Sequence, residues 1–232
     1  APMQLLFGDL HGLNTFKYQP AKVAAMEGLW ETKRGAPLLM FGLPDQEGES
    51  TRYAIEIPKL SSLILTHELD GEVKGLKEWP KDERPPVALV FWTFRIMVGL
   101  GMLMIATGVI AAVLYFRKRL FDTHWFQYWC MVMTPAGFIA VLAGWFVTEV
   151  GRQPWLVYGL LRTSDAVSPV SGTPIAISLA AFIIVYVFVF GAGVYYILRL
   201  IGKGPQTEDA AYGAHGVDQP PLVTDLSATK GE

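Results

Sequence analysis

The sequence predicts an all-α integral membrane protein with three transmembrane helices, preceded by a mixed extramembrane segment. Two observations predict this class. The chain of 232 residues is 52% hydrophobic and only 17% charged. Its charged residues lie mainly in residues 1–86 and near the C-terminus, whereas the middle of the chain holds three long apolar runs. A membrane protein separates polarity in this way, because the apolar core of a bilayer excludes charge.

The three apolar runs have the length of membrane spans. The first covers residues 87–116 and contains one charged residue, Arg95. The second covers residues 125–150 and has Pro135 in its interior, which a membrane helix tolerates more readily than a water-exposed one. The third covers residues 175–201. Each run is therefore expected to be one transmembrane helix.

Basic residues beside the runs predict their orientation. Arg117–Arg119 follow the first run, and Arg199 and Lys203 close the third. Because cytoplasmic loops carry an excess of Lys and Arg, both places are expected on the cytoplasmic side. Residues 117–124 then form a cytoplasmic loop and residues 151–174 a periplasmic loop.

The two ends of the chain predict different things. The chain begins with Ala1 rather than Met, and residues 1–7 are apolar, so we expect the end of a preceding transmembrane helix and a break within a longer protein. Residues 202–232 are rich in Gly, Pro, Asp and Thr without apolar periodicity, which is typical of a disordered cytoplasmic tail.

Residues 8–86 are expected to form a periplasmic segment of mixed structure. Pro20 opens a run to Trp30 that favours a short helix with proline in its first turn. The run Arg52–Ile57 alternates polar and apolar residues like a strand, and Pro58 ends it.

The charge balance excludes one class of partner. The formal net charge is −2 and the basic residues form no stripe, so the sequence predicts no nucleic-acid binding. The four histidines all lie outside the apolar runs, so none is expected to bind a cofactor deep in the bilayer. Any haem bound there would need a ligand from elsewhere.

Arg95 and Met97 are the first candidate site residues. An ionisable side chain within a span is costly and is often functional. Arg95, however, lies near the start of the run, about two turns from its outer end, where its side chain can also extend to the interface. The two interpretations are equally weighted. Met97 taken alone fits a packing role better than a haem-ligand role, although a thioether beside a cation suits a haem iron with propionate groups.

Glu149, Arg152 and Trp145 are the second group of candidates. Glu149 and Arg152 are three residues apart and can form an ion pair if the helix continues that far. A structural ion pair at the membrane boundary is slightly favoured on periodicity alone. Trp145 lies one turn before Glu149 on the same face, but tryptophan is also an ordinary membrane anchor.

Several motifs together resemble subunit I of cytochrome bd-type quinol oxidases, in their order and spacing. These motifs are Gly8–Asn14, Lys22–Gly28, Phe41–Asp45, Phe94–Met97 and Gly144–Trp155. The resemblance covers residues 1 to about 201. It implies the C-terminal part of a nine-helix subunit, with a periplasmic quinol-binding loop that lacks a long insertion and so is similar to the short-loop, cyanide-insensitive branch.

The resemblance also implies roles for individual residues. Lys22 and Glu27 match loop positions for quinol binding and oxidation. Met97 matches an axial ligand of the low-spin haem b iron, with Arg95 matching the arginine beside it. A further set matches the region of the active-site haems: Glu149 as carboxylate ligand of the high-spin haem b iron, with Trp145 and Arg152 nearby.

The implied cofactors are a low-spin haem b, a high-spin haem b, and either haem d or a third haem b. The implied partners are the N-terminal part of subunit I, subunit II, membrane quinol and oxygen, with a small single-helix subunit as an optional addition. The implied place is the bacterial cytoplasmic (inner) membrane. The piece is expected to be inactive by itself. It is either a truncated part of a full subunit or a natural split subunit.

Two other classes of function remain as rivals. A membrane assembly protein without catalysis would have similar helices, but the joint occurrence of the six charged and sulfur-bearing candidates at family spacing counts against it. A transporter could use Arg95 and Glu149 as intramembrane charges. Both charges are expected near one membrane face rather than at the midplane, which counts against transport.

Overall fold

The computed structural model describes residues 2–203. Three helical stretches in this range are long and apolar enough to cross a membrane: Lys81–Phe116, His124–Val150 and Gly172–Lys203. The three predicted runs are therefore confirmed as helices with the length and apolar composition of membrane spans. By its contacts the chain divides into two compact units, Ala1–Val167 and Ser168–Glu232.

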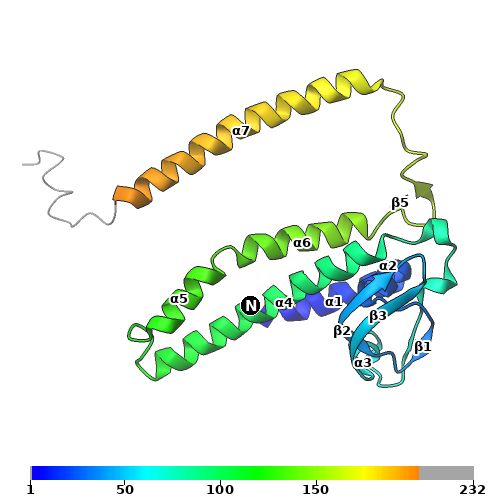
Figure 1. The fold of residues 1–232 in the computed structure, drawn as a ribbon, viewed down its shortest axis with the longest axis horizontal. Helices are drawn as coiled ribbons and strands as arrows, with labels where there is room; N and C mark the ends of the chain where they lie inside the picture. Colours follow the sequence, from blue (N-terminus) through cyan, green and yellow to red (C-terminus); the bar gives the residue numbers. More distant parts are fainter. Residues whose placement is uncertain (1, 204–232) are drawn as a thin grey trace, which may run out of the picture. The chain divides into compact units, whose positions relative to one another are not determined.

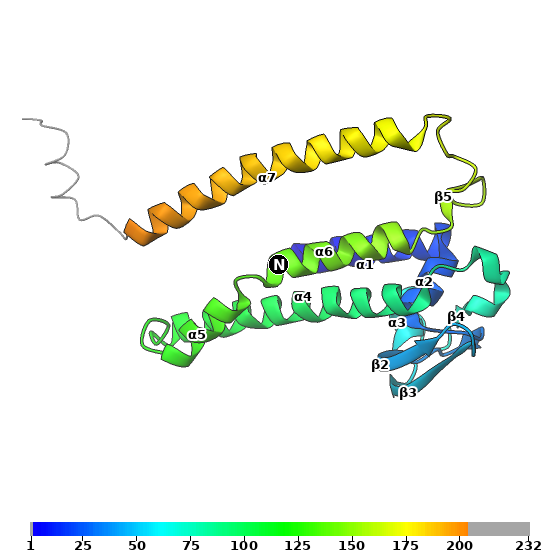
Figure 2. The same ribbon diagram turned by 45° about the horizontal axis from the view of Figure 1, so that its top comes forward.

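The first unit is built on helices α4 (Val87–Phe116) and α6 (Ala136–Val150), which lie side by side in both Figure 1 and Figure 2. The buried side chains of α6 recur three or four residues apart and are small: Ala136, Ala140, Ala143 and Val147. Small side chains on one face let two helices approach closely. This packing fixes the end of α6 that carries Glu149 against α4.

The second predicted span is not one straight helix. It consists of α5 (His124–Met133) and α6, separated at Thr134 and Pro135. Pro135 lacks a backbone N–H and therefore interrupts the helical hydrogen-bond ladder. Helix α5 also begins one residue earlier than expected, so the loop after α4 covers residues 117–123.

The boundary expected after residue 7 is wrong. Helix α1 runs from Pro2 to Tyr18 without interruption. Gly8 and Gly12 lie in it, and a Cβ added at either position would meet no other atom within 4 Å. Isolated glycines weaken a helix without ending it. The chain turns only at Gln19, because Pro20 opens the next helix. We refer to residues 19–86 as the connecting segment.

The connecting segment begins with α2 (Pro20–Glu27), which confirms the predicted short helix. Gly28 ends α2 with a positive φ of 67°, a conformation that glycine adopts without strain. Buried residues of α2, of the chain that follows it and of the start of α4 form one hydrophobic cluster: Ala24, Ala25, Trp30, Leu76, Val87 and Val90. This core holds α2 against the first span.

The rest of the connecting segment is mixed, as expected. Strands β2 (Leu38–Asp45) and β3 (Ser50–Ile57) form an antiparallel hairpin, which confirms the strand predicted before Pro58. Strands β1 (Lys33–Arg34) and β4 (Glu72–Val73) pair in a second small sheet. Helix α3 (Leu60–Thr66) and the 3₁₀ turns η1 (Leu76–Glu78) and η2 (Lys81–Glu83) complete it.

The chain after α6 departs from the expected loop of residues 151–174. It contains a short hairpin of β5 (Trp155–Val157) and β6 (Leu161–Arg162), which no pattern predicted. In the second unit, α7 runs from Gly172 to Lys203, three residues earlier and two later than the predicted third span. Pro174 fits its first turn because the first helical N–H groups need no partner. Residues 204–232 of the predicted tail lie outside the described residues.

Candidate functional site

Lys22 and Glu27 are both buried, with 8% and 6% of their surfaces exposed. They occupy the same short helix, α2, but are five residues apart and therefore point to different neighbours. Lys22 meets the end of α6, and Glu27 meets α3 and the start of α4. Helix α2 thus carries two separate charged environments.

The Lys22 ammonium is held at the end of α6. Its Nζ donates hydrogen bonds to the Thr148 carbonyl at 3.1 Å and to Gln19 Oε1 at 3.2 Å. Gly151 makes room for this side chain, because a Cβ at that position would lie 2.9 Å from Lys22 Cε. A helix end exposes unpaired carbonyls, so it is a favourable place for a cation.

Glu149 and Arg152 form the predicted ion pair, with Arg152 Nη2 and Glu149 Oε2 separated by 2.7 Å. Helix α6 ends at Val150, but Gly151 keeps helical backbone angles, which brings the two side chains together. Trp145 lies one turn earlier and is 60% exposed. Much of the Trp145 side chain therefore has no contact with the described residues of this chain.

Lys22, Glu149 and Arg152 form one group, which we call the α6-end cluster. Burial lowers the pKa of the Lys22 ammonium, Arg152 lowers that pKa further, and Glu149 opposes both. The structure thus brings together one residue of the predicted quinol loop and two residues predicted to lie near haems.

The second environment surrounds the Glu27 carboxyl. Burial raises the pKa of this carboxyl above its usual value, while the positive charge of Arg95 and the hydroxyl of Ser61 oppose the rise. Among residues 2–203, Glu27 Oε2 has no hydrogen-bond partner. Buried polar atoms normally have a partner, so this oxygen is a candidate for contact with a ligand.

Arg95 of α4 donates hydrogen bonds to backbone carbonyls of the connecting segment. Its Nε donates to the Leu39 carbonyl at 2.8 Å, Nη1 donates to the Met26 carbonyl at 2.6 Å, and Nη2 also donates to Leu39. The guanidinium carbon lies 3.3 Å from the centre of the Phe91 ring. Arg95 is thus directed into the connecting segment next to Glu27, and most of its donors are used there.

Met97 lies two residues after Arg95 on α4 and is half-buried. A Cβ at Gly144 would lie 2.9 Å from Met97 Sδ. The absence of a side chain at Gly144 therefore lets the sulfur lie against α6. The thioether carries no proton and remains a potential metal ligand.

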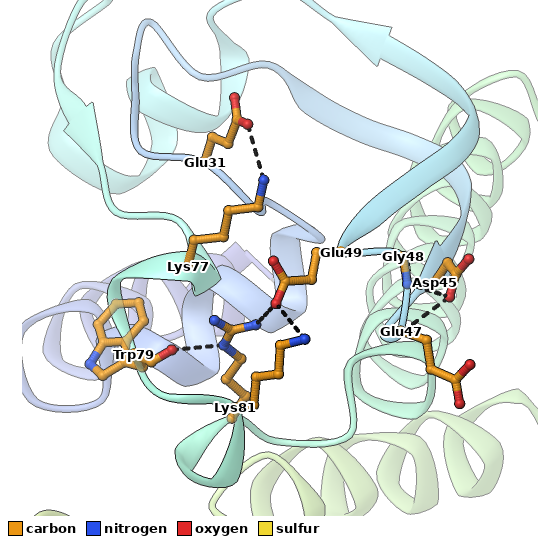
Figure 3. A network of polar contacts seen from close by, with 9 residues as sticks. Glu31, Asp45, Glu47, Gly48, Glu49, Lys77, Trp79 and Lys81 are labelled. Carbon is orange, nitrogen blue, oxygen red and sulfur yellow. Dashed lines mark hydrogen bonds and ion pairs between the residues drawn. The ribbon is translucent and has the colours of Figure 1, made fainter.

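A network of polar contacts joins residues of the connecting segment (Figure 3). Glu49 accepts hydrogen bonds from Arg84 at 2.7 Å and pairs with Lys81 at 3.4 Å. Arg84 is only 7% exposed and also donates to the Trp79 carbonyl at 2.8 Å. The hydrogen bond from Arg84 holds the pKa of the Glu49 carboxyl below its usual value. Lys77 and Glu31 pair at 3.1 Å nearby.

Sequence reasoning missed two contributors to the site. Ser61 faces Glu27 from α3, and the Thr148 carbonyl accepts the hydrogen bond from Lys22. Gly151, directly after the second span, is the one local sequence feature that indicates a close approach of Lys22 to the end of α6. Ser61 carried no signal, because its position beside Glu27 depends on how α3 folds back.

These features define an integral membrane protein with buried charged side chains where a connecting segment meets two membrane-spanning helices. Residues 1–205 match the family model described as cytochrome bd terminal oxidase subunit I. The chain belongs to this family.

Relatives agree with the family assignment. The chain is 35% identical over 215 residues to the cytochrome bd ubiquinol oxidase subunit 1 of Bacillus subtilis (strain 168), covering 88% of this chain and 46% of that protein. It is 29% identical over 267 residues to the cytochrome bd-II ubiquinol oxidase subunit 1 of Escherichia coli (strain K12), covering 87% and 52%.

A solved structure of a bd oxidase from Geobacillus thermodenitrificans is also similar, with a TM-score of 0.74 and 31% identity over 87% of this chain and 46% of that chain. The chain therefore spans about half the length of the relatives that it matches.

Proposed function

We propose that this chain is the C-terminal part of subunit I of a cytochrome bd-type terminal oxidase, which oxidises membrane quinol and reduces oxygen to water. In this proposal Lys22 and Glu27 bind quinol at the periplasmic face. Arg95, Met97, Trp145, Glu149 and Arg152 contribute to haem binding. Family membership and the geometry of α2 support the proposal.

The observation that carries the proposal is the buried, unpartnered carboxylate oxygen of Glu27. A base is most effective when its pKa is near the working pH, and burial raises the pKa of Glu27 in that direction. The carboxylate can therefore accept a proton from a quinol hydroxyl. Removal of that proton makes loss of an electron from the quinol easier.

Lys22 supplies a positive charge on the same helix. An ammonium group has three N–H donors, and two of them are used by Thr148 and Gln19. The third donor is available for a quinol oxygen that gains negative charge. Burial strengthens this stabilisation, because water screens the charge less.

The residues present fit a haem group in their donor chemistry. Met97 offers a thioether held in place beside Gly144. Glu149 uses one carboxylate oxygen in its ion pair with Arg152, which leaves the other oxygen as a ligand. Thioether sulfur is an established axial ligand of haem iron. Haem, when bound, supplies the one-electron transfer that joins quinol oxidation to oxygen reduction.

The orientation and partners follow from the same proposal. The connecting segment faces the periplasm, and Arg117–Arg119 face the cytoplasm, in line with the positive-inside rule. The N-terminal part of subunit I supplies further helices, and subunit II completes the complex. The fragment alone is inactive, because ligands and quinol contacts from these partners are absent.

The test compares quinol oxidation with oxygen reduction driven by an artificial electron donor, in the complete complex. Glu27→Gln keeps the shape but removes the base, and should lower quinol oxidation by about 100-fold or more while leaving the artificial-donor reaction intact. Glu31→Gln is a matched control, because Glu31 is exposed and, within residues 2–203, forms its one ion pair with Lys77. Equal loss of both reactions in Glu27→Gln would contradict the quinol role.

A further inference from the structure

Two adjacent serines of α3 differ in how they are used. Ser62 is fully buried, accepts a hydrogen bond from the Ala36 N–H at 2.6 Å and donates one to the Gly71 carbonyl at 2.8 Å. Ser61 is 1% exposed, and its Oγ has no hydrogen-bond partner among residues 2–203. The Ser62 hydroxyl therefore satisfies two backbone groups, whereas the Ser61 hydroxyl satisfies no backbone group among the described residues.

The Ser61 hydroxyl lies beside the Glu27 carboxyl, whose Oε2 is also buried without a hydrogen-bond partner in the described part of the chain. The two atoms come from different helices, α3 and α2, that the chain brings together through the hairpin between them. A hydroxyl can both donate and accept a hydrogen bond. It can therefore serve a neighbouring carboxyl group whether that group is ionised or protonated.

We propose that Ser61 is a positioning residue for proton transfer at Glu27: its hydroxyl orients the carboxylate toward the quinol and stabilises it before the proton arrives. This inference rests on the proposed function of Glu27. In the step, the quinol O–H bond breaks and a carboxyl O–H bond forms on Glu27. The Ser61 hydroxyl then rotates and accepts a hydrogen bond from the new carboxylic acid.

Three neighbouring influences act on the protonation of the Glu27 carboxyl, so the contribution of Ser61 can be measured by its effect on pH dependence. Burial and the charge of Arg95 on α4 act on the carboxyl in opposite directions, and Ser61 on α3 supports the ionised form. Leu39 of β2 contributes a backbone carbonyl that is occupied by Arg95. Loss of the Ser61 hydroxyl should therefore favour the protonated, inactive base.

The experiment measures the pH dependence of kcat and KM for quinol oxidation in the complete complex. In Ser61→Ala, the acid limb of the kcat profile should move to higher pH by about one unit, while KM stays close to that of the unmodified protein. Ser61→Thr keeps the hydroxyl and should keep the profile. Ser62→Ala is the matched control, since it removes a neighbouring buried hydroxyl that does not face Glu27, and its acid limb should stay in place.

An unchanged acid limb in Ser61→Ala would overturn the inference, as would an equal shift in Ser62→Ala. If Ser61→Ala does not assemble, Ser61→Cys replaces it, because cysteine has a similar shape and is a weaker donor; the same shift supports the inference and its absence overturns it. Full quinol oxidation by Glu27→Gln would instead remove the proposed function itself, and the two failures are thus distinguished.

Discussion

Gly28→Ala should loosen the connecting segment, because two features of the structure require glycine at this position. The residue has a φ of 67°, where an alanine costs about 1–2 kcal/mol. An added Cβ would also lie 2.8 Å from two carbons of the Phe91 ring. Overpacking of this kind costs about 1–3 kcal/mol. The expected loss in local stability is therefore about 2–5 kcal/mol.

The assay is protease cleavage of the connecting segment in the native complex. When opening is rapid, the cleavage rate follows the population of the opened state. A loss of about 2 kcal/mol should therefore speed cleavage roughly 30-fold. Gly12→Ala is the control. Gly12 lies in α1, an added Cβ there would meet no atom within 4 Å, and alanine favours a helix, so the cleavage rate should not rise.

A second substitution separates the two contributions. Phe91→Leu makes room for the added Cβ but leaves the positive φ in place. In a double-mutant cycle, Gly28→Ala and Phe91→Leu should couple favourably by about 1–3 kcal/mol, which is the steric part. Additive effects, or no faster cleavage in Gly28→Ala, would refute the placement of α2 on α4.

Two other predictions concern charged side chains. Arg84→Met should destabilise the connecting segment by about 1.5–3 kcal/mol in the same cleavage assay, because it breaks the partly buried hydrogen bonds to Glu49 and Trp79. Arg34→Met, which breaks an exposed ion pair, should change stability by less than about 0.5 kcal/mol. Equal effects of the two substitutions would contradict this ranking. Lys22→Met should lower kcat/KM for quinol by about 100-fold with the artificial-donor reaction intact; an unchanged kcat/KM would count against quinol stabilisation by Lys22.

The spans were predictable because their signal is local. Long apolar runs give membrane helices whatever surrounds them, and the three runs of this chain are helical in the structure. The ion pair of Glu149 and Arg152 was predictable for the same reason, since a spacing of three residues places two side chains together at a helix end.

The inner geometry of the site was not predictable from local patterns. The hydrogen bond of Lys22 to Thr148 joins residues that are distant in the sequence. Ser61 lies beside Glu27 through the tertiary fold, with the β2–β3 hairpin between them in the sequence. The boundary after residue 7 failed because an apolar start says nothing of where its helix ends. The quinol and haem roles of all the candidate site residues remain predictions from the family resemblance.

The most direct test of the central claim is the reduced-minus-oxidised visible spectrum of the complete complex with Met97→Leu. This substitution removes the sulfur, nearly conserves volume and should cost less than about 1.5 kcal/mol, so the complex should still assemble. Met104→Leu, two turns further along α4, is the matched control. The account predicts that Met97→Leu loses the low-spin haem band and Met104→Leu keeps it. An unchanged low-spin band in Met97→Leu would contradict the assignment of Met97 as a haem ligand.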